Sequence, residues 1–270
     1  MVAVLSEFMD AVRDRCPLVH HITNYVTVND CANVCICSGG SPIMTDESKD
    51  VTDISRIAGA VVLNMGTPNE RTVASMLLAG RVAKDNGVPV VFDAVGAGAT
   101  PYRNGVADTI IRSIRPEVIK GNAGEISFLA GVAGGVRGVD STSTSEDIGN
   151  LTQELAKRCG CIVVATGKRD YVSDGKEVFV LGNGSDYQGL VSGTGCMLSS
   201  VIGAYVGANG AKLCAVMAAV TAFNVAAEHA ESQCKGPGSF KVSLMDCLYG
   251  LESSDLDKEA KIERVRIAAS

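Results

Sequence analysis

The sequence predicts an α/β fold in which a doubly wound, mostly parallel sheet is flanked by helices on both faces. Short apolar runs rich in β-branched residues recur along the chain, and such runs are typical of parallel strands buried on both faces. Segments with helical spacing separate these runs. Repeated strand-helix-strand units of this kind form parallel sheets, because each helix crosses one face of the sheet before the next strand begins.

The first elements follow from the spacing of apolar residues. Leu5, Phe8, Met9 and Val12 predict a short amphipathic helix that ends ahead of Pro17. Helical patterns recur at residues 70–86, 105–114 and 145–158. Between and after them, apolar runs predict buried parallel strands at residues 60–65, 88–92, 117–119 and 161–165.

The last third of the chain departs from this alternation. Residues 171–181, with an Asp174-Gly175 turn, predict a β-hairpin. Residues 195 to about 251 predict a helical stretch that covers the sheet, and residues 261–268 return as an edge strand or a final helix. No Pro/Ser-rich linker and no repeat divides these segments, so we expect one domain over residues 1–270.

The composition limits the classes of partner. The chain has 270 residues, of which 46% are hydrophobic, enough for a sizeable core. Its formal net charge is -6 with both signs mixed along the chain, whereas a nucleic-acid binder requires a basic face. The apolar stretch at 213–227 is interrupted by Thr221 and Asn224, which favours a buried helix over a membrane span. We therefore expect no nucleic acid and no membrane as a partner.

Ten cysteines raise the question of disulfides or a metal site. The N-terminus has neither the basic region nor the apolar run of a secretory signal, so we expect a cytoplasmic protein with reduced thiols. Cys31, Cys35 and Cys37, or Cys159 and Cys161, have no nearby histidine or second pair that completes a tetrahedral zinc site. Burial as small hydrophobic residues is the better interpretation.

Polar residues follow three of the predicted strands at the point where each strand ends. Because ligands of open parallel sheets bind beyond the carboxyl ends of the strands, we expect these residues to meet at one edge of the sheet. Nearby helix N-termini add N–H groups that bind anions. The residues at this edge are Asp93, Lys120, Asn122, Glu125, Thr166 and Gly167.

The segment Gly193-Thr194-Gly195-Cys196 is the most informative of these candidates. Two glycines let the backbone approach a bulky anion, and the helix that follows supplies unpaired N–H groups and the positive end of its dipole. It is a phosphate cradle without a lysine. Cys196 lies in the first helical turn, where this field favours a thiolate that takes up a proton. Alternatively, the glycines only permit a tight turn and Cys196 packs as a hydrophobic residue.

Two common nucleotide motifs are missing. No G-x-x-x-x-G-K-[ST] sequence occurs, since Gly167 and Lys168 are followed by Arg169, which disfavours a P-loop NTPase. No G-x-G-x-x-G follows a predicted strand either, which weakens the interpretation as a dinucleotide-dependent dehydrogenase.

Six segments in order together resemble the hydroxyethylthiazole kinases, a branch of the ribokinase-like superfamily. They are PLVHHITN at 17–24, GSPIM at 40–44, LNMGT at 63–67, DAVGA at 93–97, KGNAGE at 120–125 and GTGCM at 193–197. The resemblance implies ATP-dependent phosphorylation of the hydroxyl of 4-methyl-5-(2-hydroxyethyl)thiazole, a salvage step toward thiamine. It also implies a homotrimer whose active sites lie between subunits.

The resemblance assigns roles to particular residues. The turn from Gly193 through Thr194 and Gly195 would form the anion hole, and Cys196 would replace the catalytic aspartate of ribokinase-like relatives as the base. Asn122 and Glu125 look like the N-x-x-E element that organises Mg²⁺, with Asp93 nearby. The residues implied at ATP are Lys120, Asn122, Thr166 and Gly167, and those implied at the thiazole are Asn24, Met44 and Gly193.

Two other functions remain open on the sequence. One is a kinase for another small alcohol, such as hydroxymethylpyrimidine or a sugar. The other is a non-catalytic ATP-binding protein on the same fold, which would predict loss of the base or the acidic residues. Asp93, Glu125 and Cys196 are all present, and this favours an enzyme.

Overall fold

The parallel strands form one continuous sheet because their apolar side chains are buried on both faces. The computed structural model describes residues 4–132 and 145–265, and nine strands within them pair in the order β2-β1-β3-β4-β5-β6-β7-β8-β9. The first six positions hold parallel strands, and β7, β8 and β9 each run antiparallel to the strand before them in this order. The parallel strands are β1 (Leu18–Ile22), β2 (Ser41–Met44), β3 (Ala60–Asn64), β4 (Val90–Asp93), β5 (Val118–Asn122) and β6 (Ile162–Thr166).

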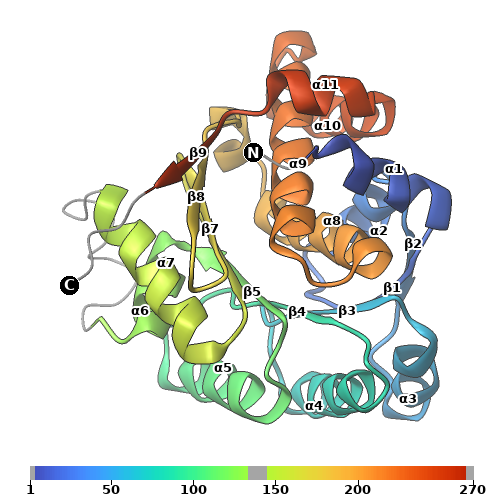
Figure 1. The fold of residues 1–270 in the computed structure, drawn as a ribbon. Helices are drawn as coiled ribbons and strands as arrows, with labels where there is room; N and C mark the ends of the chain where they lie inside the picture. Colours follow the sequence, from blue (N-terminus) through green and yellow to red (C-terminus); the bar gives the residue numbers. More distant parts are fainter. Residues whose placement is uncertain (1–3, 133–144, 266–270) are drawn as a thin grey trace.

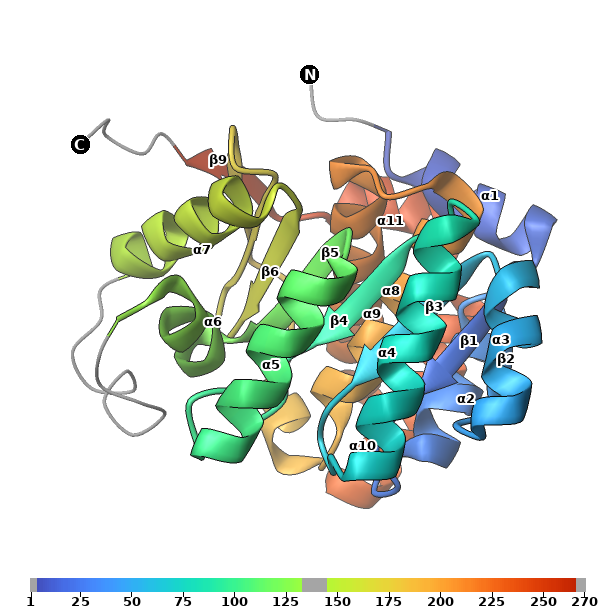
Figure 2. The ribbon, with the colours of Figure 1, turned by 90° about the horizontal axis from the view of Figure 1, so that it is seen from below.

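Helices cover both faces of the sheet, which confirms the predicted fold class (Figure 1). Figure 2 looks onto the face covered by α3, α4 and α5, with α8 and α10 behind the strands. The first face carries α3 (Ser48–Ile57), α4 (Glu70–Asp85), α5 (Pro101–Ile114), α6 (Ala123–Ala130) and α7 (Ser145–Cys159). The second carries α1 (Ser6–Arg15), α2 (Val28–Cys37), α8 (Thr194–Asn209), α9 (Leu213–Gln233), α10 (Pro237–Gly250) and α11 (Ser253–Glu259).

Local sequence sets where the helices of the first face begin. The side chain of Asn69 accepts from the amide of Thr72 at the start of α4, and the Thr72 hydroxyl accepts from the amide of Asn69 in return. Thr100 caps α5 and is followed by Pro101, which lacks the N–H that the first helical position leaves unpaired. These caps fix where each loop ends, and the loops run from the carboxyl ends of the strands.

Most predicted elements are confirmed with shifts of a few residues at their ends. The runs at 60–65, 88–92, 117–119 and 161–165 are β3 to β6, and the predicted hairpin is β7 (Asp170–Ser173) with β8 (Val178–Leu181). The helical stretch is α8 to α10. Of the two alternatives at the C-terminus, the edge strand is correct, as β9 (Ile262–Val265), while residues 266–268 lie outside the described part of the chain.

Four elements between α1 and β3 have no counterpart among the predictions. They are β1, α2, β2 and α3. β1 contains two polar residues, yet His20 bonds Ser55 of α3 and His21 bonds Ser200 of α8, so both are buried on opposite faces. β2 is a four-residue edge strand that contains Pro42, which is tolerated there because one side of an edge strand is unpaired.

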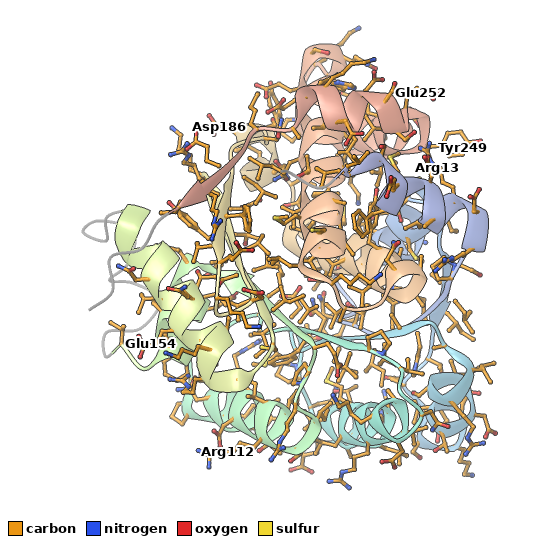
Figure 3. All side chains as sticks on the ribbon, in the orientation of Figure 1. Arg13, Arg112, Glu154, Asp186, Tyr249 and Glu252 are labelled. Carbon is orange, nitrogen blue, oxygen red and sulfur yellow. The ribbon has the colours of Figure 1, made fainter. Side chains whose placement is uncertain are left out.

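Charged and aromatic side chains of the outer helices point away from the layers. Arg112 on α5 and Glu154 on α7 project outward, and so does Tyr249 on α10 on the opposite side of the molecule (Figure 3). By length and composition alone α9 could cross a membrane, but 78% of its most apolar window is buried. Its Thr221 and Asn224 are buried within the second face, as expected for a core helix.

Helix α8 lies unusually close to the sheet because it carries a glycine where it crosses the central strands. A Cβ on Gly203 would lie 2.5 Å from Cγ2 of Val62 and 3.0 Å from Cγ1 of Val19, both in the core. The start of α8 therefore reaches the carboxyl ends of the strands at close range, where the candidate site residues lie.

We expect Gly203→Ala to lower the free energy of unfolding by about 1–3 kcal/mol, because the added methyl group overpacks the contact with Val62 and Val19. Gly105→Ala in α5 is the matched control, since a Cβ there meets nothing within 4 Å. That control is expected to raise stability by about 0.5–1 kcal/mol, the helix-propensity difference. Urea denaturation measures both, and equal effects would contradict the close contact.

Candidate active site

Three polar residues form a row across the carboxyl ends of the central strands. The sheet register pairs Asn64 of β3 with Asp93 of β4, and Asp93 with Lys120 of β5. Neighbours in register point to the same face of a sheet, so the three side chains lie together on the face covered by α8. All three are almost fully buried.

Asp93 is the centre of this row. Its carboxylate oxygens lie 3.2 and 3.3 Å from Nζ of Lys120, and Oδ2 also accepts hydrogen bonds from Asn64 (2.8 Å) and Ser199 of α8 (2.7 Å). Burial is the largest single influence on the pKa of Lys120 and lowers it, but the negative charges of Asp93, Cys196 and Glu125 outweigh burial and raise it overall. Lys120 is therefore a buried cation at working pH.

A chain of side-chain amides connects this ion pair to Cys196. Nδ2 of Asn24 donates to Oδ1 of Asn64 (3.0 Å) and to Sγ of Cys196 (3.3 Å). The Oδ1 atom of Asn24 accepts from the amides of Val26 and Thr27, which fixes the orientation of its side chain. Cys196 is thus held at a defined place beside the turn that precedes α8.

The turn presents unpaired amide groups. Gly193 is the N-cap of α8 with φ of 89°, and a Cβ there would overlap the Thr27 side chain, so both backbone geometry and space require glycine. The first helical hydrogen bond runs from the amide of Met197 to the carbonyl of Gly193 (2.9 Å). Within the described residues nothing accepts from the amides of Thr194, Gly195 and Cys196, and unpaired amides at a helix N-terminus are groups that can bind an anion.

The turn itself contains no lysine, but the structure places Lys120 of β5 directly beside it. Nζ of Lys120 lies 3.0 Å from the place where a Cβ of Gly195 would be. The lysine comes from β5 and not from the turn itself, which is why the motif alone did not indicate it. The absence of a side chain at Gly195 therefore leaves room for the ammonium group beside the unpaired amides.

The hydroxyl group of Thr194 has a structural partner. It donates to the backbone carbonyl of Gln188 at 2.8 Å, in the 3-10 helix η1 (Asp186–Leu190). Of the atoms of Thr194, the backbone amide is therefore the one available to a ligand, and the hydroxyl ties η1 to the start of α8.

The N-x-x-E element forms a capping box at the start of α6. Oδ1 of Asn122 accepts from the amide of Glu125 (2.9 Å), and Oε2 of Glu125 accepts from the amide of Asn122 (2.7 Å). Oε1 of Glu125 accepts from the amide of Gly96 (2.7 Å), which ties the loop after β4 to α6. Burial raises the pKa of Glu125 despite the opposing charge of Lys120.

The two predicted metal ligands are engaged with protein donors. Each oxygen of Glu125 accepts one amide hydrogen bond and so retains a lone pair, whereas Oδ2 of Asp93 already accepts from three groups. In the described part of the chain no three His, Cys, Asp or Glu side chains gather closely enough to hold a metal ion by themselves. These residues fit a hydrated ion reached through water better than a direct ligand set.

A cavity of about 630 Å³ opens beside the turn. It lies between the loop after β6 and the segment from Gly182 to Gly195, with α9 at its back. Five residues predicted at the anion or nucleotide line it, namely Asn122, Thr166, Gly167, Thr194 and Gly195. The fold thus brings predicted residues from separate segments of the chain to the wall of a single cavity.

A second cavity, of about 250 Å³, lies at the other end of the row. It is lined by Met44, Thr23, Tyr25 and Val28, among others, from β1, β2 and α2. Asn24 and Gly193 are absent from its lining although the prediction groups them with Met44. Asn24 contacts the sulfur of Cys196 at the start of α8.

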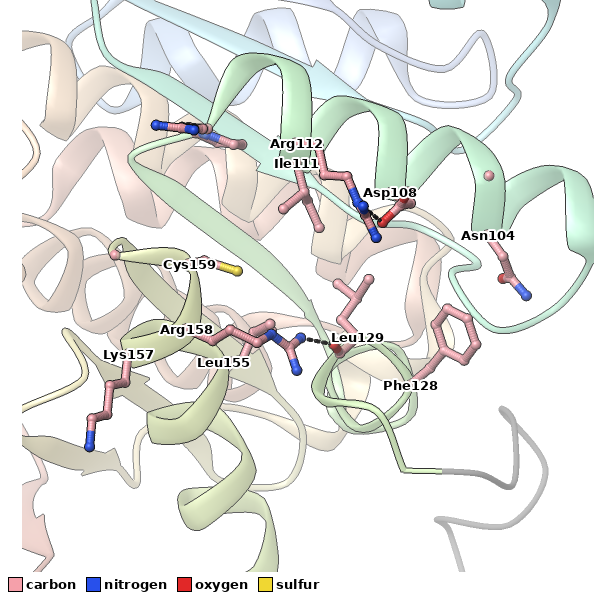
Figure 4. A pocket seen from close by; sticks show the side chains of 14 residues that line it. Asn104, Asp108, Ile111, Arg112, Phe128, Leu129, Leu155, Lys157, Arg158 and Cys159 are labelled. Carbon is pink, nitrogen blue, oxygen red and sulfur yellow. Dashed lines mark hydrogen bonds and ion pairs between the residues drawn. The ribbon is translucent and has the colours of Figure 1, made fainter.

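A larger cavity of about 970 Å³ lies elsewhere, between α5, α6 and α7 (Figure 4). Two of its positive side chains have protein partners: Arg112 pairs with Asp108, and Arg158 donates to the carbonyls of Leu129 and Ala130 at the end of α6. None of the predicted site residues lines it.

The doubly wound sheet of this chain, with unpaired amides at the start of α8 and two cavities at its strand ends, belongs to the class of ribokinase-like folds. Solved structures with low sequence identity support the fold: a ribokinase-like superfamily protein from Enterococcus faecalis aligns at a TM-score of 0.66 with 11% identity over 93% of this chain and 94% of that chain. The pyridoxal kinase of Staphylococcus aureus in complex with ADP aligns at 0.60 with 17% identity over 78% and 86%.

The model of the hydroxyethylthiazole kinase family matches residues 9–254. A hydroxyethylthiazole kinase from Methanocella arvoryzae is 45% identical over 96% of this chain and 97% of its own length. The structure of a hydroxyethylthiazole kinase protein from Pyrococcus horikoshii aligns at a TM-score of 0.89 with 38% identity, covering 97% of this chain and 99% of that chain. The chain therefore belongs to the hydroxyethylthiazole kinase family and is an enzyme of the kinase class.

Asn64 and Ser199 are site residues that the sequence analysis did not identify. Asn64 is a polar residue near the end of the apolar run predicted at 60–65, and this was the available signal. Ser199 lies one turn into α8, where no motif marks it.

We expect Asn64→Ala to lower the free energy of unfolding by about 2–4 kcal/mol, because it removes a donor to the buried Asp93 and an acceptor for Asn24. Asn33→Ala is the matched control, since Asn33 bonds only Asn29 on the exposed side of α2. Thermal and urea unfolding measure both variants, and a small effect of Asn64→Ala would show that the amide chain is not coupled to the ion pair.

Proposed function

We propose that this kinase transfers the terminal phosphoryl group of ATP to the hydroxyl of 4-methyl-5-(2-hydroxyethyl)thiazole, as a single catalytic domain in the cytoplasm. Membership of the family supports the acceptor. The observation that carries the proposal is the unpaired turn from Thr194 to Cys196, with the Lys120 ammonium group against it and the thiol at its end.

The cavity of about 630 Å³ is proposed to hold ATP. Its phosphates would lie toward the turn, with Asn122, Thr166 and Gly167 on the facing wall. Phosphoryl transfer depends mainly on positioning and on neutralising charge on the transferred oxygens. The amides of Thr194 and Gly195, together with Lys120, supply fixed positive potential at that place and need no rearrangement during the reaction.

Cys196 is proposed as the base that accepts the hydroxyl proton. Asn24 holds its sulfur at the mouth of the turn, so the thiol lies next to the amides that would bind the phosphate. A base positioned in this way typically contributes about 10²–10⁴-fold in rate. The thiazole would enter from the side of Met44, with its hydroxyl directed to Cys196 and Gly193.

Mg²⁺ is proposed as the metal that accompanies ATP. When bound, it neutralises negative charge on the β- and γ-phosphates. Mg²⁺ keeps several waters and few protein ligands, which agrees with a site where Glu125 and Asp93 are bonded to protein groups. Glu125 would hold water of the ion through its remaining lone pairs, and Asp93 would keep Lys120 charged and in place.

A homotrimer with active sites between subunits is also part of the proposal. Apolar side chains are exposed around the Met44 cavity: Tyr25 is 77% exposed, Val26 59% and Val28 37%. A contiguous exposed apolar surface beside a binding cavity is typical of an interface. A second subunit placed there would cover these residues and complete the wall of the cavity.

We expect Cys196→Ala to lower kcat by about 10²–10⁴-fold while leaving the unfolding temperature unchanged, and Cys196→Asp to retain activity because a carboxylate takes the same proton. Cys214→Ala, at the start of α9, is the control for loss of a thiol. ATP consumption is measured with thiazole, pyrimidine and sugar alcohols, which also distinguishes the acceptor. A Cys196→Ala enzyme with the parent kcat would rule out the base.

We expect Tyr25→Asp to convert the trimer to smaller species and to reduce kcat/KM by about 10-fold or more, since a charge cannot be buried unpaired in an interface. Tyr102→Asp in α5 is the control, because Tyr102 is likewise an exposed tyrosine. Light scattering after size-exclusion chromatography gives the subunit number. A parent chain that elutes as a monomer at assay concentration would refute the interface.

A further inference from the structure

A chain of hydrogen bonds joins the two walls of the nucleotide cavity, and it begins at Asp170. This residue opens β7 and is 5% exposed. Its Oδ1 accepts from the amide of Gly167 (2.9 Å), in the loop after β6. Its Oδ2 accepts from Nδ2 of Asn224 (2.7 Å), in the middle of α9.

The chain of hydrogen bonds continues from α9 to the opposite wall of the cavity. Oδ1 of Asn224 accepts from Nε2 of Gln188 (3.1 Å), and Oε1 of Gln188 accepts from the backbone amide of Ser185 (2.9 Å). The backbone carbonyl of Gln188 in turn accepts from the hydroxyl of Thr194 (2.8 Å). All of these residues line the cavity of about 630 Å³.

The two ends of this hydrogen-bond chain determine the orientation of the side-chain amides of Asn224 and Gln188, which lie between them. An ionised carboxylate only accepts, and a backbone N–H only donates. With Asp170 at one end and the amide of Ser185 at the other, Asn224 and Gln188 each have one orientation in which every donor meets an acceptor. A side chain that donates at position 170 would turn both amides and leave the Ser185 amide without its acceptor.

The buried carboxylate of Asp170 lowers the stability of the fold, so its presence points to a functional role. Burial raises the pKa of Asp170 to about 6, from the ordinary value of 3.8. Because the folded-state pKa is the higher one, the folded protein loses stability as the pH rises from about 4 through about 6. The described residues contain no ion-pair partner within bonding distance, and Lys120 is the positive group that acts on Asp170 over a longer range. Other charged residues of the same cavity are Lys168, Asp186 and Glu231.

We propose that Asp170 is the positioning residue of the nucleotide cavity: by accepting from Gly167 and Asn224, it orients the amide chain that holds η1 and Thr194 in place. The ligand class is a nucleoside triphosphate, and the inference rests on the function proposed above. Asp170 acts on the phosphate-binding amides through Asn224 and Gln188. Its loss therefore weakens nucleotide binding more than it changes the chemical step.

The variant Asp170→Asn tests whether Asp170 sets the orientation of the amide side chains in this hydrogen-bond chain. The substituted side chain accepts from Gly167 but directs its own N–H at Asn224, so one donor meets another donor along the chain. We expect the dissociation constant for ATP to rise by about 10-fold or more, consistent with one unsatisfied buried donor. The unfolding temperature at pH 7 is expected to stay level or rise, because the costly buried charge is gone.

The reciprocal exchange, Asp170→Asn combined with Asn224→Asp, is the decisive variant. The carboxylate then lies at position 224, where it accepts from the side-chain amide at position 170 and from Gln188. The carbonyl oxygen of the amide at position 170 still accepts from Gly167, so every group has a partner again. We expect this double variant to recover ATP affinity to within about threefold of the parent, a residual difference of well under 1 kcal/mol. Asp174→Asn is the matched control, since Asp174 accepts two amides in the exposed turn of the same hairpin.

Calorimetric titration of each variant with ATP and Mg²⁺, without an acceptor alcohol, keeps this test separate from the choice of substrate. The parent is expected to lose affinity as the pH falls through about 6, and Asp170→Asn is expected to lack that step. Parent-like affinity of Asp170→Asn, or equal loss in the single and double variants, overturns the proposal. A parent that binds ATP but does not phosphorylate the thiazole alcohol refutes the proposed function alone.

Discussion

The buried ion pair between Asp93 and Lys120 is the constraint on which the rest of the site depends. Two charges removed from water are tolerated only when further hydrogen bonds satisfy them. Here Asn64 and Ser199 donate those hydrogen bonds to the carboxylate of Asp93. The arrangement leaves the ammonium group directed at the start of α8, against Gly195. A positive charge and unpaired amides therefore meet at one point inside the fold, in a place that water and salt screen weakly.

The fold produces this arrangement through register and close packing. Parallel pairing puts Asn64 and Asp93, the last residues of β3 and β4, beside Lys120 of β5, so three segments far apart in the sequence form one row. Helix α8 can reach that row because Gly203 lets it lie against Val19 and Val62. The glycines of the turn then serve different purposes: Gly193 fits a left-handed backbone beside Thr27, and Gly195 makes room for the lysine.

Sequence patterns were sufficient for β3 to β6, because continuous apolar runs identify strands buried on both faces, whereas β9 was left open between a strand and a helix. They failed for β1, where His20 and His21 interrupt the apolar run and only tertiary partners explain their burial. At the site, the sequence predicted that the glycine turn and the strand-end residues lie at one edge of the sheet, but it did not predict the hydrogen-bond partners of those residues. That Lys120 reaches the turn depends on a distance that a linear motif does not contain, whereas the spacing of Asn122 and Glu125 is itself that of a capping box.

The central claim is that the terminal phosphate of ATP binds where Lys120 and the unpaired amides meet. A crystal structure of the enzyme with a non-hydrolysable ATP analogue and Mg²⁺ measures this directly. The account predicts a γ-phosphate within hydrogen-bonding distance of the amides of Thr194 to Cys196 and of Nζ of Lys120, with the Cys196 sulfur beside it. A γ-phosphate bound elsewhere, with those amides turned to protein acceptors, would contradict it.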